Sequence, residues 1–489
     1  MSKDTNSYRS ILKGTAMFGG VQVFNILINL LRGKFIAILL GPEGMGISSL
    51  LTTASNTIQQ FSSLGLNSAT VKEVAAAKEM GQDAYLSKIV CIIRDLLRIT
   101  AALGAVITII LSSYLSQWTF GTEDYTWHFR FISIVVFFTT MANGELSILQ
   151  GLHAVKHLAF ASVIGSLVGL FAGIPLYYFW GYNGIVPAMI ILSISIYLFY
   201  RFSHKRLNYT YKREPLIWKE KKEISTKILI LGFVLMIAAL LGTLANFLLN
   251  ACIRHYGSLE DVGLYQASYS ITSQYAGLVF TAMALDFFPR LSAIASDNNK
   301  VREIVNQQSE IVVLAITPII TLVILLAPLL IKILLTNEFL TLIPVVRLMA
   351  VGLFFKAMAY PIGYISFSKG DKKFFFWLEG VWGNCLTLSL NVFFYLRYGI
   401  WGIGVSFVVS YSIFVLVYLY LTHRRYQFYY TTSFLKLSIL LLLLLCLSYG
   451  ASLIKAPFIS YICMGIVCIT CILICLYNLN VRLQFIKKR

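Results

Sequence analysis

Three cations lie deep within apolar segments of the sequence. Arg32 and Lys34 sit in the apolar run at residues 14–40, and Lys356 interrupts another run at residues 342–367. A lone charge at the centre of a bilayer costs about 2.5 to more than 10 kcal/mol unless it pairs, reaches the interface or faces water. Fixed cations in a wet cavity bind anions, and the planar donors of Arg suit phosphate. These residues therefore predict anion binding inside a membrane.

Polar side chains extend the face on which Arg32 lies. At about 100° per residue, one stripe of the first segment holds Gln22, Asn25, Asn29 and Arg32. Lys34 falls about 200° away from Arg32 in a regular helix. The next segment carries a similar stripe of Ser48, Thr52, Ser55, Gln59 and Ser62. Such faces form either interhelical hydrogen bonds or the wall of an aqueous cavity, and the arginine favours the cavity.

The rest of the chain explains why these residues need a membrane context. It has 489 residues, of which 58% are hydrophobic and 12% charged. Runs of about 20 apolar residues are what a helix needs to cross about 30 Å of hydrocarbon. We predict fourteen spans, at residues 14–40, 44–70, 89–112, 128–152, 158–180, 184–201, 226–252, 261–290, 310–333, 342–367, 374–396, 401–421, 434–454 and 459–479. The sequence therefore predicts an all-α integral membrane protein, and its first span is expected to stay uncleaved.

The distribution of Lys and Arg between the loops predicts how the chain is oriented in the membrane. With the N-terminus inside, 29 of the 40 lie in inner loops and tails, and three lie in outer loops. This asymmetry places both termini in the cytoplasm. The net charge of +19 is then explained by topology and by contact with anionic lipid headgroups, so nucleic-acid binding is not expected.

A weak internal repeat divides the chain. The stretch "NFLLNACIR" places Asn246, Asn250 and Arg254 in the seventh span, much as "NILINLLR" places Asn25, Asn29 and Arg32 in the first. The two spans start from the same side, which predicts a parallel repeat about an axis along the membrane normal. The predicted domains are a six-helix bundle at 1–201, a basic linker at 202–225, a second six-helix bundle at 226–422, and two extra helices with a basic tail at 423–489.

Three acids are candidates to compensate the cations or to couple transport to an ion. Glu379 and Lys356 lie on either side of a short inner hairpin, where pairing is expected either for packing or for transport. Asp286 and Glu145 lie nearer the inner ends of their spans, where solvation is an alternative to compensation. A carboxylate that loses its cation to a substrate would take up a proton.

Ordered motifs resemble a known family. The stretches "GKFIAILLGPEGMG", "FFPRLSAIAS", "LLTNEF" and "FKAMAYPIGYISFSKGDKKFFFWLEG" are similar to the polysaccharide transporter branch of the multidrug/oligosaccharidyl-lipid/polysaccharide (MOP) exporter superfamily, and more narrowly to Wzx-type flippases for O-antigen units and the enterobacterial common antigen lipid. The likeness covers roughly residues 10 to 422. It implies two pseudo-symmetric six-helix bundles in a V shape, as in multidrug exporters of the MATE type, with a cationic cavity between them.

The resemblance also implies residue roles. Lys34, Lys356 and Glu379 match charged positions of the family, whereas the chain has Ser273 where related sequences can carry an acid. That departure leaves proton or sodium coupling open. Substrate contacts are expected from Arg32, Lys34, Asn25, Asn29, Gln59, Asn246, Asn250 and Lys356, and compensation or coupling from Glu379, Asp286 and Glu145.

The implied function is a flippase. It would move an undecaprenyl diphosphate-linked oligosaccharide, an O-antigen or related repeat unit, from the cytoplasmic to the periplasmic leaflet of the bacterial inner membrane by alternating access. Expected partners are this glycan lipid, membrane lipids, and polysaccharide polymerase or assembly proteins. We predict no catalytic residues, no cofactor and no metal, because the sequence has no nucleophile with a base, no phosphate-binding loop and no ligand spacing.

Two alternatives remain. A small-molecule exporter of the same superfamily predicts an aromatic or acidic pocket, whereas the deep charges here are mainly cationic. A membrane glycosyltransferase or polymerase predicts catalytic acids in a large outer loop, and only Glu123 and Asp124 in a short loop fit that role.

Overall fold

The computed structural model describes residues 2–81, 83–207 and 218–488. Within these ranges, side chains are described except at 2–19, 21, 22, 83, 155, 218–220, 234, 235, 238, 274–276, 278, 281, 282, 284–286 and 483–488. The described residues are almost entirely helical and contain no β-strand. Helices satisfy every backbone donor and acceptor within one segment, which is what hydrocarbon requires of a spanning chain.

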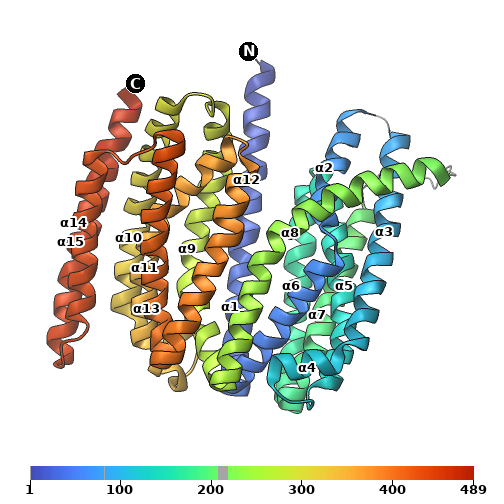
Figure 1. Ribbon diagram of the computed structural model, residues 1–489, viewed down its shortest axis with the longest axis horizontal. Coiled ribbons are helices and arrows are strands. Elements are labelled where there is room, and N and C mark those ends of the chain that lie inside the picture. Colours follow the sequence, from blue (N-terminus) through green and yellow to red (C-terminus); the bar gives the residue numbers. More distant parts are fainter. Residues whose placement is uncertain (1, 82, 208–217, 489) are drawn as a thin grey trace. The chain divides into compact units, whose positions relative to one another are not determined.

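The chain forms two compact units, Met1–Val262 and Gly263–Arg489. The helices of the first unit are α1 (Ser2–Ser62), α2 (Leu66–Glu79), α3 (Asp83–Ile110), α4 (Ser112–Phe120), α5 (Thr126–Gly151), α6 (Val155–Trp180), the 3₁₀ turn η1 (Gly181–Gly184), α7 (Ile185–Lys205) and α8 (Trp218–Tyr256). In Figure 1, α1 runs in one direction and turns back at Gly41, whose φ is 65°. It therefore supplies two spans.

The second unit is built from the remaining helices. They are α9 (Leu259–Ala293), α10 (Asn298–Leu334), the 3₁₀ turn η2 (Asn337–Leu342), α11 (Ile343–Ser368), α12 (Lys372–Phe375), the π-helix η3 (Phe376–Gly383), α13 (Asn384–Tyr426), α14 (Thr432–Ala451) and α15 (Pro457–Lys488). Most of α9 belongs to this unit. Helix α13 bends at Gly399, where φ is 59°, and so it also supplies two segments.

About fourteen helices are available to cross a membrane. Eight stretches are long and apolar enough, or nine when α3 and α4, which meet at 68°, count as one broken span. Three of these stretches hold two helices each, broken at Gly41, at η1 and at Gly399. The long helices α8 and α9, which are not among these stretches, bring the number in the described part of the chain to about fourteen. The prediction of an all-α membrane protein with about fourteen spans is confirmed.

Small residues set the closest helix packing. Gly165 and Gly169 of α6 face Ile196 and Leu192 of α7, and a Cβ added at either glycine would clash with its partner. This i, i+4 spacing is the small-residue motif by which membrane helices approach each other. In the second unit α11 packs along α13 in the same way, with Gly352 against Phe407.

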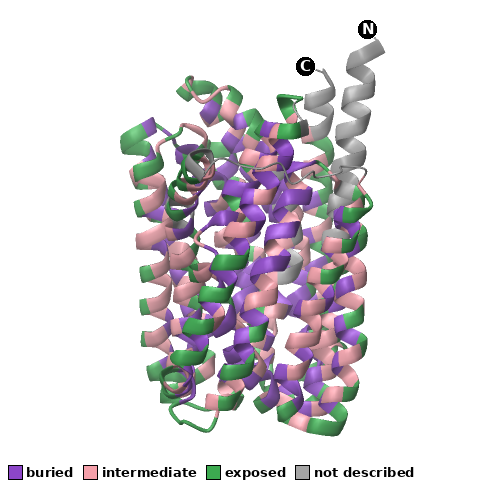
Figure 2. Ribbon diagram, turned by 90° about the vertical axis from the view of Figure 1, so that its right-hand side faces the viewer, coloured by how far each residue is buried: buried purple, intermediate pink, exposed green. Residues whose placement is uncertain are grey.

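The outer faces of the helices are apolar. Figure 2 shows helices that are buried along one side and exposed along the other. On α15 the exposed side carries Ile462, Ile466, Ile469, Leu473 and Leu476 at helical spacing. A contiguous exposed surface of this kind is explained by contact with lipid chains.

One turn is repeated in both units. Gly181 and Gly399 have similar backbone conformations, with positive φ of 55° and 59° and ψ of −132° and −147°. Three residues later, Gly184 and Gly402 press against the carbonyls of Leu176 and Phe394, where any Cβ would clash. The two turns are 218 residues apart, so they add a structural element to the weak repeat of the sequence. The contacts of α8 place this helix in the first unit. The start of the second six-helix bundle at residue 226 stays a prediction.

Candidate functional site

Asn25 forms a helix contact. Its amide donates to Ser162 Oγ at 2.8 Å and accepts from Ser166 Oγ at 3.4 Å, both on α6. Asn29, one turn further along α1, is exposed. The predicted polar stripe therefore contains one residue that joins two helices, Asn25, and one that is exposed, Asn29.

Arg32 and Lys34 are partly exposed, and among the described residues neither forms an ion pair. The Arg32 guanidinium lies near the Tyr177 side chain of α6. Helix α1 has no non-helical residue before Gly41. Arg32 and Lys34 therefore point to different faces, since a regular helix separates them by about 200°.

The polar residues of α8 mainly join helices. The Asn250 side chain is fully buried, accepts from Ser49 Oγ at 3.2 Å and donates to the Asn246 carbonyl at 2.8 Å. Asn246 itself is exposed. Gln59 is buried, and its Nε2 has no hydrogen-bond partner among the described residues. A buried amide donor without a partner normally marks a missing ligand or water.

Lys356 lies between aromatic rings instead of beside an acid. Its ammonium is 5.7 Å from the Phe280 ring centroid and 5.4 Å from that of Tyr411. Glu379 lies on the π-helix η3 and is hydrogen-bonded to the Tyr418 hydroxyl. The expected pairing of Lys356 with Glu379 is wrong, because aromatic faces stabilise the lysine and a tyrosine satisfies the acid.

Glu145 is the centre of a buried charge cluster. It accepts from Arg94 Nε at 2.9 Å and Nη2 at 3.0 Å, and from Arg201 Nη1 at 2.9 Å. His204 Nδ1 lies 3.8 Å from its other oxygen. Glu145 is 2% exposed, so it is not solvated, and it compensates cations on α3 and α7. Sequence analysis missed this cluster because its members are far apart in the chain. The side chain of Asp286 lies outside the described residues.

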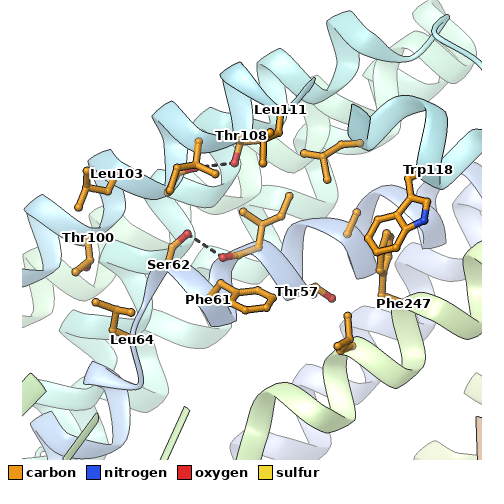
Figure 3. A pocket seen from close by; sticks show the side chains of 16 residues that line it. Thr57, Phe61, Ser62, Leu64, Thr100, Leu103, Thr108, Leu111, Trp118 and Phe247 are labelled. Atoms are coloured by element: carbon orange, nitrogen blue, oxygen red, sulfur yellow. Dashed lines mark hydrogen bonds between the residues drawn. The ribbon is translucent and has the colours of Figure 1, made fainter. Parts of the chain in front are cut away.

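An apolar cavity of about 490 Å³ lies within the first unit, between α1, α3, α4 and α8. Figure 3 shows Trp118 and Phe247 at one end and Leu64 and Thr100 toward the other. The hydroxyls in its wall bond to backbone carbonyls, as Thr108 does to Gly104 at 2.7 Å and Thr57 does to Thr53 at 2.8 Å and to Thr243 of α8 at 3.4 Å. The wall therefore offers no free polar group from these threonines, and it suits an alkyl chain.

A surface cluster closes the α11–α12 turn. The Asp371 carboxylate accepts from Tyr426 Oη at 2.8 Å, from Arg425 Nε at 2.6 Å and from the Phe374 backbone N–H at 3.3 Å. Partial burial acts to raise the pKa of Asp371, but these hydrogen bonds outweigh it and hold the pKa below its usual value. Asp371 also caps the N-terminus of α12.

The comparison with protein families identifies the chain. The model described as "Polysaccharide biosynthesis protein" matches residues 35–344. The chain belongs to this family. The part of the resemblance that concerns polysaccharide biosynthesis, inferred from the sequence motifs, is confirmed.

Among curated proteins, this member of the polysaccharide biosynthesis family is similar to the lipid III flippases of Escherichia coli (strain K12) and Shigella flexneri. Each is 22% identical over 376 residues, which cover 76% of this chain and 88% of the relative. Flippase and transporter relatives agree with the prediction that the chain is a transporter and not an enzyme.

Solved structures show the same fold. One neighbour is an inward-facing multidrug resistance MATE family transporter of the MOP superfamily, with a TM-score of 0.72, 17% identity, and coverage of 82% of this chain and 94% of that one. Another is the lipid II flippase MurJ in an inward closed conformation, with a TM-score of 0.70, 15% identity, and coverage of 96% and 99%. The predicted MATE-like fold is confirmed.

Proposed function

We propose that this protein flips an undecaprenyl diphosphate-linked oligosaccharide, an O-antigen or related repeat unit, from the cytoplasmic to the periplasmic leaflet of the bacterial inner membrane. Family membership and the lipid III flippase relatives support the coarser statement that it is a flippase for a lipid-linked oligosaccharide. The O-antigen identity, the direction and the alternating-access mechanism belong to the proposal, as do the cytoplasmic location of both termini and a link to polymerase or assembly proteins.

One observation carries the proposal. Arg32, Lys34 and Lys356 lie within spanning helices, are partly exposed, and have no ion pair among the described residues. A bilayer penalises each such charge, so each of these side chains needs water, an anion or, as for Lys356, aromatic rings beside it. A diphosphate supplies that anion, and it needs fixed cations because its own transfer into hydrocarbon is prohibitive.

The supporting polar residues have separate roles in this proposal. Gln59 has a buried donor available for a ligand, and Asn29 and Asn246 are exposed. Asn25 and Asn250 position their helices through bonds to neighbouring side chains. Glu145 balances Arg94 and Arg201.

Ion coupling would use a carboxylate that changes its protonation during transport. Glu379 is the candidate, because its one assigned partner is a tyrosine hydroxyl and not a cation. Asp286 remains a second candidate from the sequence. Proton and sodium coupling are both compatible with a single carboxylate.

The test is a gene deletion followed by complementation. Loss of the protein should cause lipid-linked repeat units to accumulate in the inner leaflet, and the wild-type gene should clear them. Arg32→Ala and Lys34→Ala should each reduce clearance about tenfold or more, since a hydrogen bond to a charged group contributes about 1.5 to 3 kcal/mol. Arg98→Ala, which changes an exposed arginine paired with Asp95, is the control and should clear normally.

Charge reversal sharpens this test. Glutamate at position 32 or 34 should abolish clearance, because it repels an anionic cargo. Normal complementation by both alanine variants would reject the assignment of these cations. Absence of accumulation in the deletion strain, together with export of small cationic drugs, would instead identify a multidrug exporter.

A further inference from the structure

A ladder of aromatic side chains begins beside Lys356 and continues to the far end of α11. Ring centroids are 4.6 Å apart for Phe280 and Tyr360 and 5.3 Å apart for Tyr360 and Tyr364. Tyr364 lies 6.0 Å from Phe288, which lies 4.7 Å from Phe367, and Phe367 lies 5.0 Å from Phe375. These six residues, Phe280, Tyr360, Tyr364, Phe288, Phe367 and Phe375, form what is called the aromatic ladder below.

Helix periodicity places the ladder on one face of α11. Tyr360, Tyr364 and Phe367 follow Lys356 at intervals of 4, 8 and 11 residues, which is one side of a helix. Phe280 and Phe288 of α9 lie eight residues apart and pack against that side. The lysine and the rings therefore belong to one continuous surface.

The exposure of this surface differs from that of a packed core. Phe367 is 47% exposed, and Tyr360, Tyr364, Phe288 and Phe375 are each partly exposed. Phe280 alone is buried. A core side chain would be covered on all sides, so the exposed parts of these rings are available to a ligand.

The chemistry of the surface also differs from that of a lipid-facing one. Lys356 lies near the middle of the 26-residue helix α11, about 20 Å from either end at 1.5 Å per residue. The Tyr360 and Tyr364 hydroxyls bond to each other at 3.2 Å. A cation at this depth would be costly against acyl chains, whereas the exposed residues from Ile462 to Leu476 named above for α15 are aliphatic.

We infer that the aromatic ladder binds the sugar residues of the transported lipid while Lys356 binds the adjoining phosphate. The C–H face of a pyranose ring carries partial positive charge and packs against the negative face of an aromatic ring. Tyrosine hydroxyls add hydrogen bonds to sugar hydroxyls. The inference rests on the proposed function and names the glycan subsite within it.

The arrangement matches the order of groups in such a lipid. The first sugar is bonded directly to the diphosphate, and Tyr360, the first partly exposed ring of the ladder, lies one helical turn from Lys356. Later sugars would lie over Tyr364, Phe288 and Phe367. Because stacking on a ring depends little on the identity of the sugar, the ladder supplies glycan affinity with broad tolerance.

Binding of three probes to the purified full-length protein in nanodiscs tests the inference. The probes are bare undecaprenyl diphosphate and the same lipid carrying a chain of three N-acetylglucosamine or three galactose residues, which extends past the first ring of the ladder. Wild type should bind both glycosylated probes more tightly than the bare one. Tyr364→Leu and Phe367→Leu should each weaken glycosylated binding about three- to tenfold, the amount expected for one aromatic contact, and leave bare diphosphate binding unchanged.

Matched variants separate stacking from general damage. Tyr364→Trp keeps an aromatic face and should retain glycosylated binding. Phe458→Leu and Tyr477→Leu remove exposed rings from α15 and should change nothing. Lys356→Met should weaken all probes equally, because the phosphate is common to them.

Three results would overturn the inference. Equal losses for bare and glycosylated probes in the leucine variants would mean that the ladder shapes the phosphate site only. Unchanged binding in the leucine variants would mean that the rings do not contact the glycan. Equal wild-type affinity for all probes would remove the glycan subsite but keep a diphosphate-lipid flippase, whereas no binding of any probe would reject the proposed function itself.

Discussion

Arg94 and Glu145 form a two-point ion pair in the interior of the first unit. Arg94 Nε lies 2.9 Å from one carboxylate oxygen and Nη2 lies 3.0 Å from the other. Arg201 contacts the same carboxylate from α7. One acid therefore joins three helices, and its removal leaves two cations without compensation.

Glu145→Gln should lower the free energy of unfolding by about 3 to 5 kcal/mol, since breaking a buried pair leaves an uncompensated charge. Thermal and denaturant unfolding of the purified protein in detergent measures this. Arg98→Ala, which breaks an exposed pair, should cost less than about 1 kcal/mol. Equal stability of the two variants would show that the buried cluster contributes nothing special.

The repeated turn predicts matched effects in the two units. Gly184→Ala and Gly402→Ala each place a Cβ against a backbone carbonyl, and each should destabilise the protein by about 1 to 3 kcal/mol through overpacking. Gly450→Ala, where a Cβ meets nothing within 4 Å, should be neutral or stabilising by up to about 1 kcal/mol. Thermal unfolding compares the three variants, and a neutral Gly402→Ala would contradict the close approach.

Lys356 should affect transport and stability in opposite directions. Lys356→Met removes a costly charge from the middle of α11, so the variant should unfold at the same or a higher temperature. It should nevertheless lose about tenfold or more in complementation, because the substrate loses a charged contact. Lys356→Arg keeps the charge and should retain most transport. Full transport by Lys356→Met would reject a substrate role for this residue.

Asp371 is expected to contribute to the free energy of unfolding in a pH-dependent way. Its pKa is held below the ordinary value, so the charged form is favoured in the folded state. The stabilisation is therefore present above the ordinary pKa of about 4 and is lost as pH falls through the lowered folded value. Asp371→Asn keeps a capping side chain but removes the charge. At pH 7 it should be less stable than wild type by up to about 1 kcal/mol.

Unfolding measurements between pH 3 and pH 7 check this sign. The difference between wild type and Asp371→Asn should shrink as the pH falls below about 4. A difference that stays constant over this range would show that the carboxylate charge is not involved.

Several features of the site were predictable from sequence. The depth of Arg32 and Lys356 follows from their position in apolar runs, because rise per residue is fixed. The sequence also indicated that three aromatic residues share a helix face with Lys356, because they follow it at helical spacing: Tyr360, Tyr364 and Phe367. The sequence analysis did not use this pattern. The partners were not predictable: Glu145 bonds to residues 51 and 56 positions away, and Lys356 meets rings in place of Glu379.

The amino-acid sequence alone determined the helical class, the approximate number of spans and the depth of each charge. These depend on how each segment partitions into hydrocarbon, which is a local property of some 20 residues. Only the tertiary structure decided which charged side chains form ion pairs and which form none among the described residues. Helix rotation and neighbour choice depend on packing between distant segments, such as the packing of Gly165 and Gly169 of α6 against α7, and a single segment does not encode its partner.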